Sequence, residues 1–481
     1  MKRIFKKKCI EDVLNIASSS QELKRSIGPM GLTVMGVGAI IGAGIFIITG
    51  VASAKSGPGL VLSFIIAAIA CTFTALCYAE FASMIPVAGS VYTYTYVAMG
   101  EIWAWIIGWI LMFEYLIASS SVAIGWSAYT VGMLKSMGIM LPALLTNPWG
   151  VGGGLINLPA LIIVALLTGV LFRGAQESAR FNAAAVAIKI AVIVIFIAVG
   201  LQFINPSNYH PFMPHGWSGI FQGASMVFFA YIGFDAVASA AEEAKNPQKT
   251  LPIGIIGSLI ISSILYIAVA VVMTGMVNYT FLNNPAPVST ALEHVGVGWA
   301  LSIVGLGAIA GLTTVILVNL FGQTRITFAM SRDGLLPEFF SRVHEKSKAP
   351  SGSILIIGVI AAIISAFLPM ESIFELVNVG ALSAFIFLAL SIIILRKNSP
   401  DICRGFKCPL VPVIPLLSIV MSLILISKLS THTIQTFIIW ILVGMVFYFA
   451  YGRHKGRFKI VSDEEYPNEI NPVEESIETG K

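Results

Sequence analysis

Residues 36–46 of this 481-residue chain read Gly36-Val37-Gly38-Ala39-Ile40-Ile41-Gly42-Ala43-Gly44-Ile45-Phe46, with four glycines among nine residues. The run lies inside an apolar stretch that is long enough to cross a membrane as a helix. Each glycine in a helix interior costs about 1 kcal/mol relative to alanine. One interpretation is close packing of this helix against a neighbour through small residues. The other is a helix broken between Ile40 and Gly44, whose free backbone groups line a cavity.

A second stretch of the same kind favours the broken helix. Residues 228–235 read Phe228-Phe229-Ala230-Tyr231-Ile232-Gly233-Phe234-Asp235, so a glycine and an acidic residue lie in the middle of another apolar span. The two stretches fall in the first and sixth of the 12 apolar spans that are given below. The first span begins one set of five helices and the sixth begins another, and the two spans run through the membrane in opposite directions. Broken helices at matching places of an inverted repeat mark a substrate site near the membrane midplane.

The composition places most of the chain in lipid. Hydrophobic residues make up 57% of the sequence and charged residues 11%, whereas soluble domains carry about 25% charged residues. We therefore expect an all-α, polytopic membrane protein with 12 transmembrane helices of about 20 residues each. The apolar stretches lie near 30–50, 58–79, 101–127, 155–172, 182–203, 218–240, 252–277, 298–324, 352–369, 374–395, 410–429 and 432–452.

The basic residues predict the orientation, because cytoplasmic segments carry the excess of Lys and Arg. With the N-terminus inside, 25 of the 29 Lys and Arg residues lie in the two tails or in the loops near 173–180, 245–249, 325–348 and 396–407. Three lie in outer loops (Lys55, Lys135 and Lys428), and Lys189 lies within a span. The sequence therefore predicts cytoplasmic termini, and we read the basic first 29 residues as a cytoplasmic tail.

The two breaks offer opposite kinds of hydrogen-bonding groups. The outer half of the first span begins near Ala43 and Gly44, where free N–H groups and the positive end of the helix dipole suit a carboxylate. Carbonyls left free near Ile40, Phe229 and Ala230 suit an ammonium group. Such a pocket fits the constant part of an α-amino acid. The predicted substrate-binding residues are Ile40, Ile41, Gly42, Ala43, Gly44, Phe229, Ala230 and Ile232.

The acidic residue of the sixth span bears on the substrate side chain. Asp235 opens the inner half of that span, where the role of an N-cap is expected. Apart from Asp235, neither break contains a charged side chain. A neutral substrate side chain is therefore expected.

Two further charged residues lie deep inside predicted spans and are the predicted proton-coupling residues. Lys189 is nine residues past Arg180, which places it about 13 Å deeper in the membrane. Burial lowers the proton affinity of a lysine, so Lys189 suits a proton carrier. The alternative is a static ammonium bonded to the broken end of the first span. Glu114 either pairs with Tyr115 or Ser119, or faces the site and transfers protons.

Two residues are candidates for gating. Phe229 is predicted to close over the substrate as an outer gate, with simple helix packing as the alternative. Glu80 lies at the cytoplasmic end of the second span, where we expect a structural, interfacial role or a part in an inner gate. Glu242 and Glu243, after the sixth span, are expected to pair with basic loop residues.

Enzymatic and metal-dependent functions find no support in the sequence. No HExxH, Walker-type GxxxxGK or nucleophile triad is present, and the histidines lie in loops or near helix ends. The five cysteines have no metal or disulfide spacing. We therefore expect no catalytic residue, metal, cofactor or nucleic acid. The cysteines are Cys9, Cys71, Cys77, Cys403 and Cys408.

Over residues 25–452 the chain resembles the amino acid–polyamine–organocation (APC) superfamily, and most of all bacterial relatives of the cationic amino acid transporters. The segments that carry the likeness are Gly38-Ala39-Ile40-Ile41-Gly42-Ala43-Gly44-Ile45-Phe46, Tyr78-Ala79-Glu80-Phe81, Pro86-Val87-Ala88-Gly89-Ser90, Phe229-Ala230-Tyr231-Ile232-Gly233-Phe234-Asp235, Glu242-Glu243-Ala244-Lys245-Asn246-Pro247-Gln248-Lys249 and Ser331-Arg332-Asp333-Gly334-Leu335-Leu336-Pro337.

The resemblance implies a five-plus-five inverted-repeat core, two extra helices and alternating access around a central site. It also implies amino acid transport, by proton coupling or by exchange. In proton-driven relatives a lysine at the place of Lys189 stands where sodium sits in sodium-coupled relatives. Members named for cationic substrates include carriers of neutral ones, so the resemblance leaves the substrate charge open.

These observations predict four regions: a tail (1–29), the inverted-repeat core (30–395), two further helices (396–452) and a disordered cytoplasmic tail (453–481). We expect proton-coupled uptake of small or medium neutral L-amino acids across the cell membrane. An amino acid or polyamine exchanger and a cationic amino acid carrier are the alternatives. The expected partners are the amino acid, the proton and the lipid bilayer, and a small membrane-protein partner is left open.

Overall fold

The computed structural model describes residues 27–85, 90–173, 179–239, 244–344, 349–402 and 404–453, together with Lys7. Over these residues the chain is helical, and its only β-type pairings are two isolated bridges, Ile27 with Ala244 and Pro148 with Leu155. The predicted all-α class is confirmed.

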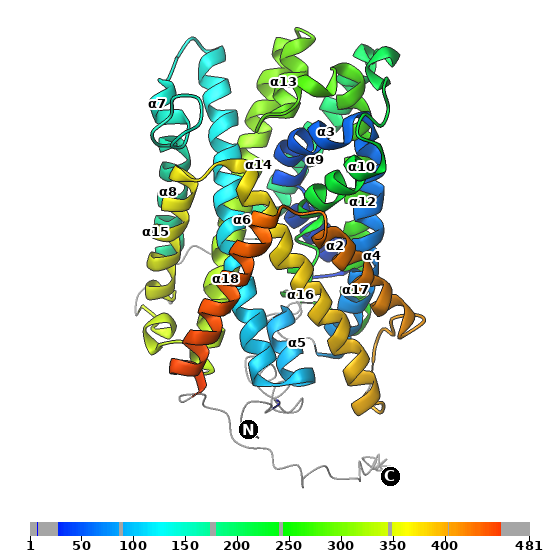
Figure 1. Cartoon of the computed structure of the whole chain (residues 1–481), viewed down its shortest axis with the longest axis vertical. Coiled ribbons are helices and arrows are strands. Elements are labelled where there is room, and N and C mark those ends of the chain that lie inside the picture. The colour runs from blue at the N-terminus through cyan, green and yellow to red at the C-terminus, as the bar shows by residue number, and fades with distance from the viewer. Residues whose placement is uncertain are drawn as a thin grey trace, which may run out of the picture.

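The longer helices run side by side along the vertical direction of Figure 1. They are α2 (Pro29–Ile40), α4 (Leu60–Met84), α6 (Glu101–Ser136), α8 (Leu158–Phe172), α9 (Ala179–Gly200), α10 (Gly216–Val227), α12 (Pro247–Met276), α14 (Gly298–Arg332), α15 (Ser351–Phe367), α16 (Met370–Asn398), α17 (Val413–Ile426) and α18 (Thr431–Phe447). Shorter helices are α3 (Thr49–Ser56), α5 (Ser90–Met99), α7 (Ala143–Thr146), α11 (Ala236–Ser239) and α13 (Pro287–His294).

Seven helical stretches among the described residues are long and apolar enough to cross a membrane. They are Pro29–Met84, Glu101–Ser136, Ala184–Phe203, Pro247–Met276, Gly298–Arg332, Ile373–Asn398 and Thr431–Gly452. The first of them contains two of the predicted spans, which are separated by a turn of 3-10 helix at Gly57–Gly59. Three shorter apolar helices, α8, α15 and α17, accompany them.

Two helices extend furthest beyond their predicted spans. α6 continues to Ser136 instead of ending near residue 127, and α14 continues to Arg332 instead of ending near residue 324. Each ends just before a glycine with positive φ, Gly138 or Gly334, and such residues commonly terminate helices. Arg325 is therefore a helical residue and not a loop residue, and its guanidinium lies 4.7 Å from the ring centre of Phe321.

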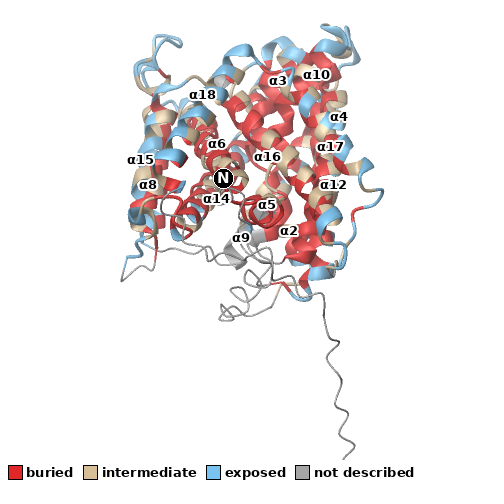
Figure 2. Cartoon of the chain, turned by 60° about the horizontal axis from the view of Figure 1, so that its bottom comes forward, coloured by how far each residue is buried: buried red, intermediate tan, exposed pale blue. Residues whose placement is uncertain are grey.

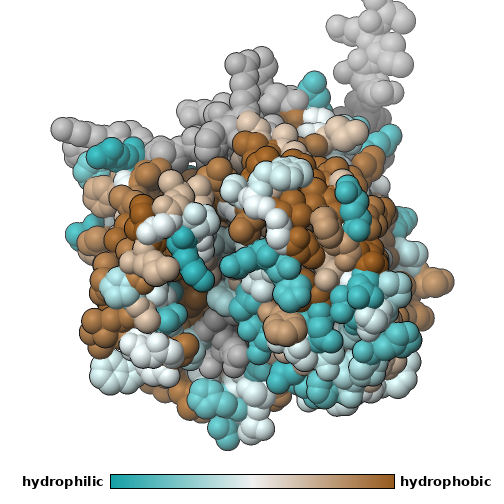
Figure 3. Space-filling view, turned by 90° about the horizontal axis from the view of Figure 1, so that it is seen from above, coloured by the Kyte–Doolittle hydropathy of each residue, from teal (hydrophilic) through white to brown (hydrophobic). Residues whose placement is uncertain are grey.

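Side-chain burial is concentrated in the middle of the bundle, where α6 packs against α14 and α16, and α12 packs against α2 and α4 (Figure 2). On the periphery the exposed side chains are themselves apolar, as at Leu442 and Val446 of α18. This pattern fits a bundle with lipid on its sides. Seen from above, hydrophilic residues gather across the middle of the end face, with hydrophobic residues at its sides (Figure 3).

Candidate functional site

The first span is interrupted at the predicted place. α2 ends at Ile40, and its last turn is closed by the bond from Ile41 N to Val37 O, 2.8 Å. The chain bends at Ile41 and Gly42 and resumes as a π-helical turn, Gly44–Ile48, that leads into α3. The N–H groups of Ala43 and Gly44 thus lie at the start of the outer half, where a helix leaves its first donors without intrahelical partners.

The sixth span is interrupted as well. α10 ends at Val227 and is followed by a 3-10 turn, Phe228–Tyr231. Ile232 is extended, and Gly233 has a φ of 125°, a backbone angle that residues with a Cβ rarely adopt. α11 begins right after Asp235, so Asp235 occupies the position predicted for an N-cap.

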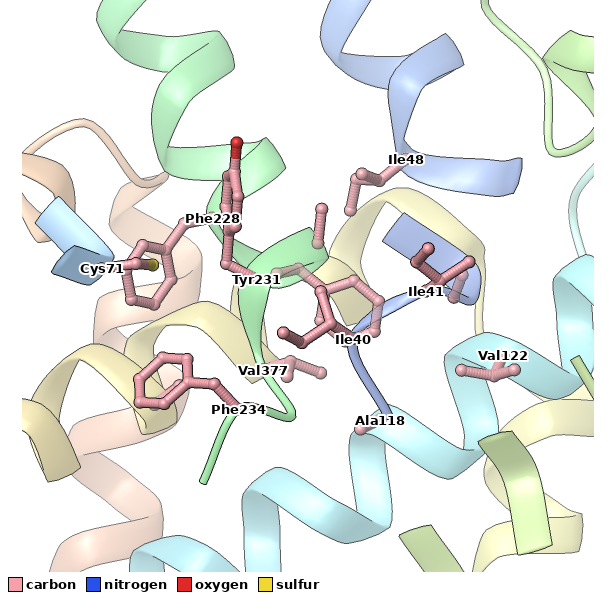
Figure 4. Close-up of a cluster of buried hydrophobic side chains, with 14 of the residues drawn as sticks. Ile40, Ile41, Ile48, Cys71, Ala118, Val122, Phe228, Tyr231, Phe234 and Val377 are labelled. Carbon is pink, nitrogen blue, oxygen red and sulfur yellow. The ribbon is translucent and has the colours of Figure 1, made fainter. Parts of the chain in front are cut away.

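The two interruptions contact each other backbone to backbone. A Cβ placed on Gly44 would overlap Ala230 Cα, and a Cβ placed on Gly233 would lie 2.8 Å from the carbonyl of Ala39. The predicted substrate-binding residues of both spans are therefore brought together. In Figure 4, Ile40 and Ile41 lie at the unwound segment, between the part of the chain that carries Tyr231 and helix α6.

The surroundings of the breaks are apolar and unequally covered. Ala118 and Val122 of α6 and Val377 of α16 lie around the unwound segment (Figure 4). A Cβ on Gly42 would lie 2.5 Å from Val315 of α14. The part of the first span that follows the break is buried from Gly44 to Ser53, whereas Ala39, Ile232, Gly233 and Asp235 are half-buried. The site is thus better covered beside Gly44 than beside Ile232 and Gly233.

Tyr266 of α12 joins the two breaks, a role that the sequence did not reveal. Its hydroxyl lies 2.7 Å from Ile40 O and 2.8 Å from Ala230 O. These are two of the carbonyls predicted to receive an ammonium group. A single O–H proton faces two acceptors, so Tyr266 can donate fully to only one of the two carbonyls at a time.

Lys189 of α9 reaches the same region. Its side chain is 2% exposed, and its Nζ donates to Gly38 O at 2.9 Å. Gly311 of α14 makes room for the stem, because a Cβ there would lie 3.1 Å from Lys189 Cγ. The ammonium is therefore bonded to the last turn of α2, as the static alternative requires, and a proton on that nitrogen would be sensed directly by the break.

Glu114 lies on α6 against Gly380 of α16. Its Oε2 is buried and has no hydrogen-bond partner among the described residues. The partners suggested by the sequence bond elsewhere: Ser119 donates to Leu116 O at 2.9 Å, and Tyr115 lies 3.5 Å from Asp235 Oδ2. Glu114 Oε2 is therefore paired with neither Tyr115 nor Ser119.

Phe229 packs edge-on against Phe374 of α16, with 5.3 Å between ring centres. One turn along α16, the buried Asn378 donates to Ser225 O at 2.7 Å and to Met226 O at 3.2 Å. Asn378 thereby satisfies carbonyls at the end of α10 just before the break. Both contacts attach the segment of the predicted outer gate to α16.

Glu80 lies in a buried ionic cluster near the end of α4. Its carboxylate pairs with Arg396 at 2.6 Å and Arg404 at 3.2 Å, and it accepts a bond from Cys408 N at 2.7 Å. Ser83 adds a second attachment, since its hydroxyl accepts from Phe406 N at 3.0 Å. These contacts tie the α16–α17 loop to α4.

Replacement of Glu80 by glutamine is expected to destabilise the protein. Removal of one partner from a buried ion pair costs about 3–5 kcal/mol, because the remaining charge stays desolvated. Arg404, whose side chain is 5% exposed, would be left in that position. Thermal unfolding of purified Glu80→Gln should occur at a clearly lower temperature than wild type. Glu293→Gln, on an exposed site of α13, is the control and should unfold at the wild-type temperature. Equal unfolding temperatures of the two variants would contradict a stabilising role of the ionic cluster.

Other predicted residues divide by where they lie. Cys71, Cys77 and Cys408 are buried free thiols, and no cluster of three or more metal-ligating side chains occurs in the described part of the chain. Cys9, Cys403, Glu242 and Glu243 lie outside the described residues.

Comparison with known proteins agrees with this geometry. The family model described as amino acid permease matches residues 27–448. The branched-chain amino acid permease BcaP of Bacillus subtilis is 49% identical over 94% of this chain and 98% of its own length. The methylthioribose transporter of the same organism is 47% identical, with the same two coverages. The chloroplastic cationic amino acid transporter 9 of Arabidopsis thaliana is 38% identical over 79% of this chain and 68% of its own length.

Proposed function

Because the chain belongs to the amino acid permease family of the APC superfamily, we propose that it is a secondary active carrier for proton-coupled uptake of small or medium neutral L-amino acids. It is a multi-pass membrane protein. The proposal includes 12 spans in a five-plus-five inverted repeat with two extra helices, cytoplasmic termini and a place in the cell membrane. The observation that carries it is the backbone contact between the broken first and sixth spans, Gly44 with Ala230 and Gly233 with Ala39.

The chemistry of the two breaks supports a zwitterionic substrate. In this proposal the N–H groups from Gly42 to Gly44 receive the carboxylate. The carbonyls of Ile40, Phe229 and Ala230 receive the ammonium group, with Tyr266 sharing two of them. Ile41 and Ile232 complete the binding set. The apolar neighbours Val122 and Val315 support a neutral, aliphatic side chain over a cationic one.

The unequal cover of the site supports alternating access. Phe229, with Phe374, forms the outer gate, and the half-buried inner side offers the path toward the cytoplasm. Glu80 holds the cytoplasmic ends of α4 and α16 together, so its part in an inner gate is to keep these two helices moving as one unit. Lys189 and Glu114 carry the coupling proton.

Uptake into proteoliposomes tests the transport reaction. Radiolabelled alanine or leucine should accumulate when an inward proton gradient is imposed and should only equilibrate without one. A requirement for internal amino acid, with no response to the gradient, would replace the symporter by an exchanger. Strong uptake of arginine or lysine in preference to alanine and leucine would replace the neutral substrate by a cationic one.

A second candidate substrate comes from the relative named methylthioribose transporter. Methylthioribose has neither an ammonium nor a carboxylate group, so only its neutral hydroxyls could form hydrogen bonds with the free N–H and carbonyl groups of the two breaks. A thermal-shift screen of purified protein with the twenty amino acids and methylthioribose separates the two classes. Stabilisation by methylthioribose alone would overturn the amino acid assignment.

Tyr266→Phe is expected to weaken amino acid binding by about tenfold, which corresponds to about 1.4 kcal/mol. The hydroxyl bridges the carbonyls of Ile40 and Ala230, and its loss lets these two groups, which receive the ammonium, move out of position. Equilibrium binding of labelled substrate measures the change. Tyr209→Phe is the control, because that hydroxyl donates to Val271 O away from the breaks; equal affinity in the two variants would remove Tyr266 from the site.

A further inference from the structure

The connection from α6 to α8 has an unusual composition for a chain segment outside a membrane. Between Lys135 and Arg173 the sequence contains no Lys, Arg, Asp, Glu or His. The α6–α8 segment, residues 137–157, makes up more than half of that stretch. The other two long connections on the predicted outer side carry ionisable residues, namely His210 and His215 before α10, and Glu293 and His294 before α14.

The α6–α8 segment exposes large apolar side chains. Met140 is 79% exposed and Trp149 is 69% exposed, and α7, in its middle, has no buried residue. Exposed apolar patches of this kind mark contact with another surface. The other large exposed side chains are Met137, Ile139, Leu141, Leu144, Val151 and Leu155.

The segment is nevertheless folded, and part of its backbone is paired internally. Leu155 N and Ile156 N both donate to Leu144 O, at 3.0 and 3.1 Å, and Gly154 N donates to Val151 O at 2.8 Å. Its end is fastened by Asn157, whose N donates to Ala366 O at 2.9 Å and whose Oδ1 accepts from Ser127 at 2.6 Å. Each such bond lowers the cost of placing the segment in the water-poor edge of a membrane.

The length of α8 indicates what covers these side chains. Its 15 residues span about 22 Å, less than the roughly 30 Å of a bilayer core. α7 contacts α8 and continues its side of the molecule toward the end where α13 lies (Figure 1). The exposed apolar surface of the α6–α8 segment is therefore continuous with that of α8, which exposes Ile162 and Leu166.

We propose that the α6–α8 segment is embedded in the outer leaflet of the bilayer, with Trp149 in the interfacial region and Met140 and Leu144 among acyl chains. Lipid is the occupant that fits best, because the segment has no charge for a protein partner to match and lies against a helix too short to span alone. Tryptophan is the side chain that membrane–water interfaces favour. This inference rests on the proposed topology, in which the segment faces the outside.

Site-specific fluorescence in vesicles tests the inference. Met140→Cys is labelled with bimane in full-length protein that carries Cys9→Ser and Cys403→Ser and retains the buried Cys71, Cys77 and Cys408. The protein is reconstituted in phosphatidylethanolamine and phosphatidylglycerol vesicles. Ser207→Cys, in the exposed turn Pro206–Tyr209 on the same predicted side, is the matched control. Thermal unfolding of both labelled proteins verifies that they are folded.

The expected result is several-fold stronger quenching at Met140 than at Ser207 by a doxyl-labelled phospholipid, and the reverse order with external iodide. Quenching of both sites by iodide alone would overturn the inference and make the segment a water-exposed loop. Protection of Met140 from both quenchers would overturn it in favour of a protein partner or a second copy. If iodide reaches Ser207 only from the vesicle interior in right-side-out particles, the proposed topology itself fails, and the two failures are thereby distinguished.

Discussion

Lys189→Met is expected to abolish proton-driven accumulation while it preserves substrate binding. Methionine keeps an apolar stem beside Gly311 and removes the ammonium that donates to Gly38 O. One proton that moves down a gradient of one pH unit supplies about 1.4 kcal/mol, or roughly tenfold accumulation of a substrate that moves with it. Wild-type protein should approach that ratio in proteoliposomes, and the variant should stop at equal concentrations inside and outside.

Counterflow and binding are the accompanying measurements. With equal pH on both sides, Lys189→Met should still exchange labelled for unlabelled substrate, and its affinity should stay within a few-fold of wild type. Lys189→Ala should likewise lose accumulation and keep binding and exchange. Its stability should be lower, because alanine leaves a cavity where the lysine methylene groups were. Full accumulation by either variant would remove Lys189 from coupling. Loss of binding in both would assign Lys189 to the scaffold of the break.

Gly44→Ala is expected to have the second large effect, a loss of substrate affinity on the order of a hundredfold. The new Cβ would overlap Ala230 Cα, so the two broken segments must separate by a distance on the scale of 1 Å. Displacements of this size commonly cost about a hundredfold where several groups must act together. Equilibrium binding on folded, monodisperse protein measures the change.

Gly169→Ala in α8 is the matched control, because nothing lies within 4 Å of a Cβ at that position. Alanine there should leave affinity unchanged and slightly favour the helix. If Gly44→Ala bound substrate as well as Gly169→Ala, the close approach of the two segments would have no part in recognition.

The interruptions were predictable because their causes are local. Gly42 and Gly44 lie close together in the first span, and Gly233 lies beside Asp235 in the sixth. Each glycine lowers the stability of a helix, and both helices break at these places. Tyr266 was not predictable in the same way. Nothing in the sequence around it specifies which face of α12 meets the breaks, and its acceptors are 36 and 226 residues away.

The ionic cluster at Glu80 was also not predictable from the sequence, because its partners are distant in the chain. A carboxylate at the predicted end of a span suggested an interfacial residue, yet Glu80 is fully buried against Arg396 and Arg404. The partners lie more than 300 residues later in the chain, Arg396 near the end of α16 and Arg404 in the loop that follows it. By contrast, the true end of α14 could have been predicted from the sequence, since Gly334 is the first residue after the span that favours a helix stop.

The position of Tyr266 has a consequence for an empty carrier. Its one hydroxyl proton lies between carbonyls of two segments that must separate or tilt if the site is to face the other side of the membrane. Once they part, one carbonyl loses its donor while it is still buried, at a cost of about 1–3 kcal/mol. A bound ammonium supplies the missing donor. We therefore expect the unloaded protein to reorient more slowly than the loaded one, which would limit futile leakage of protons in the absence of cargo.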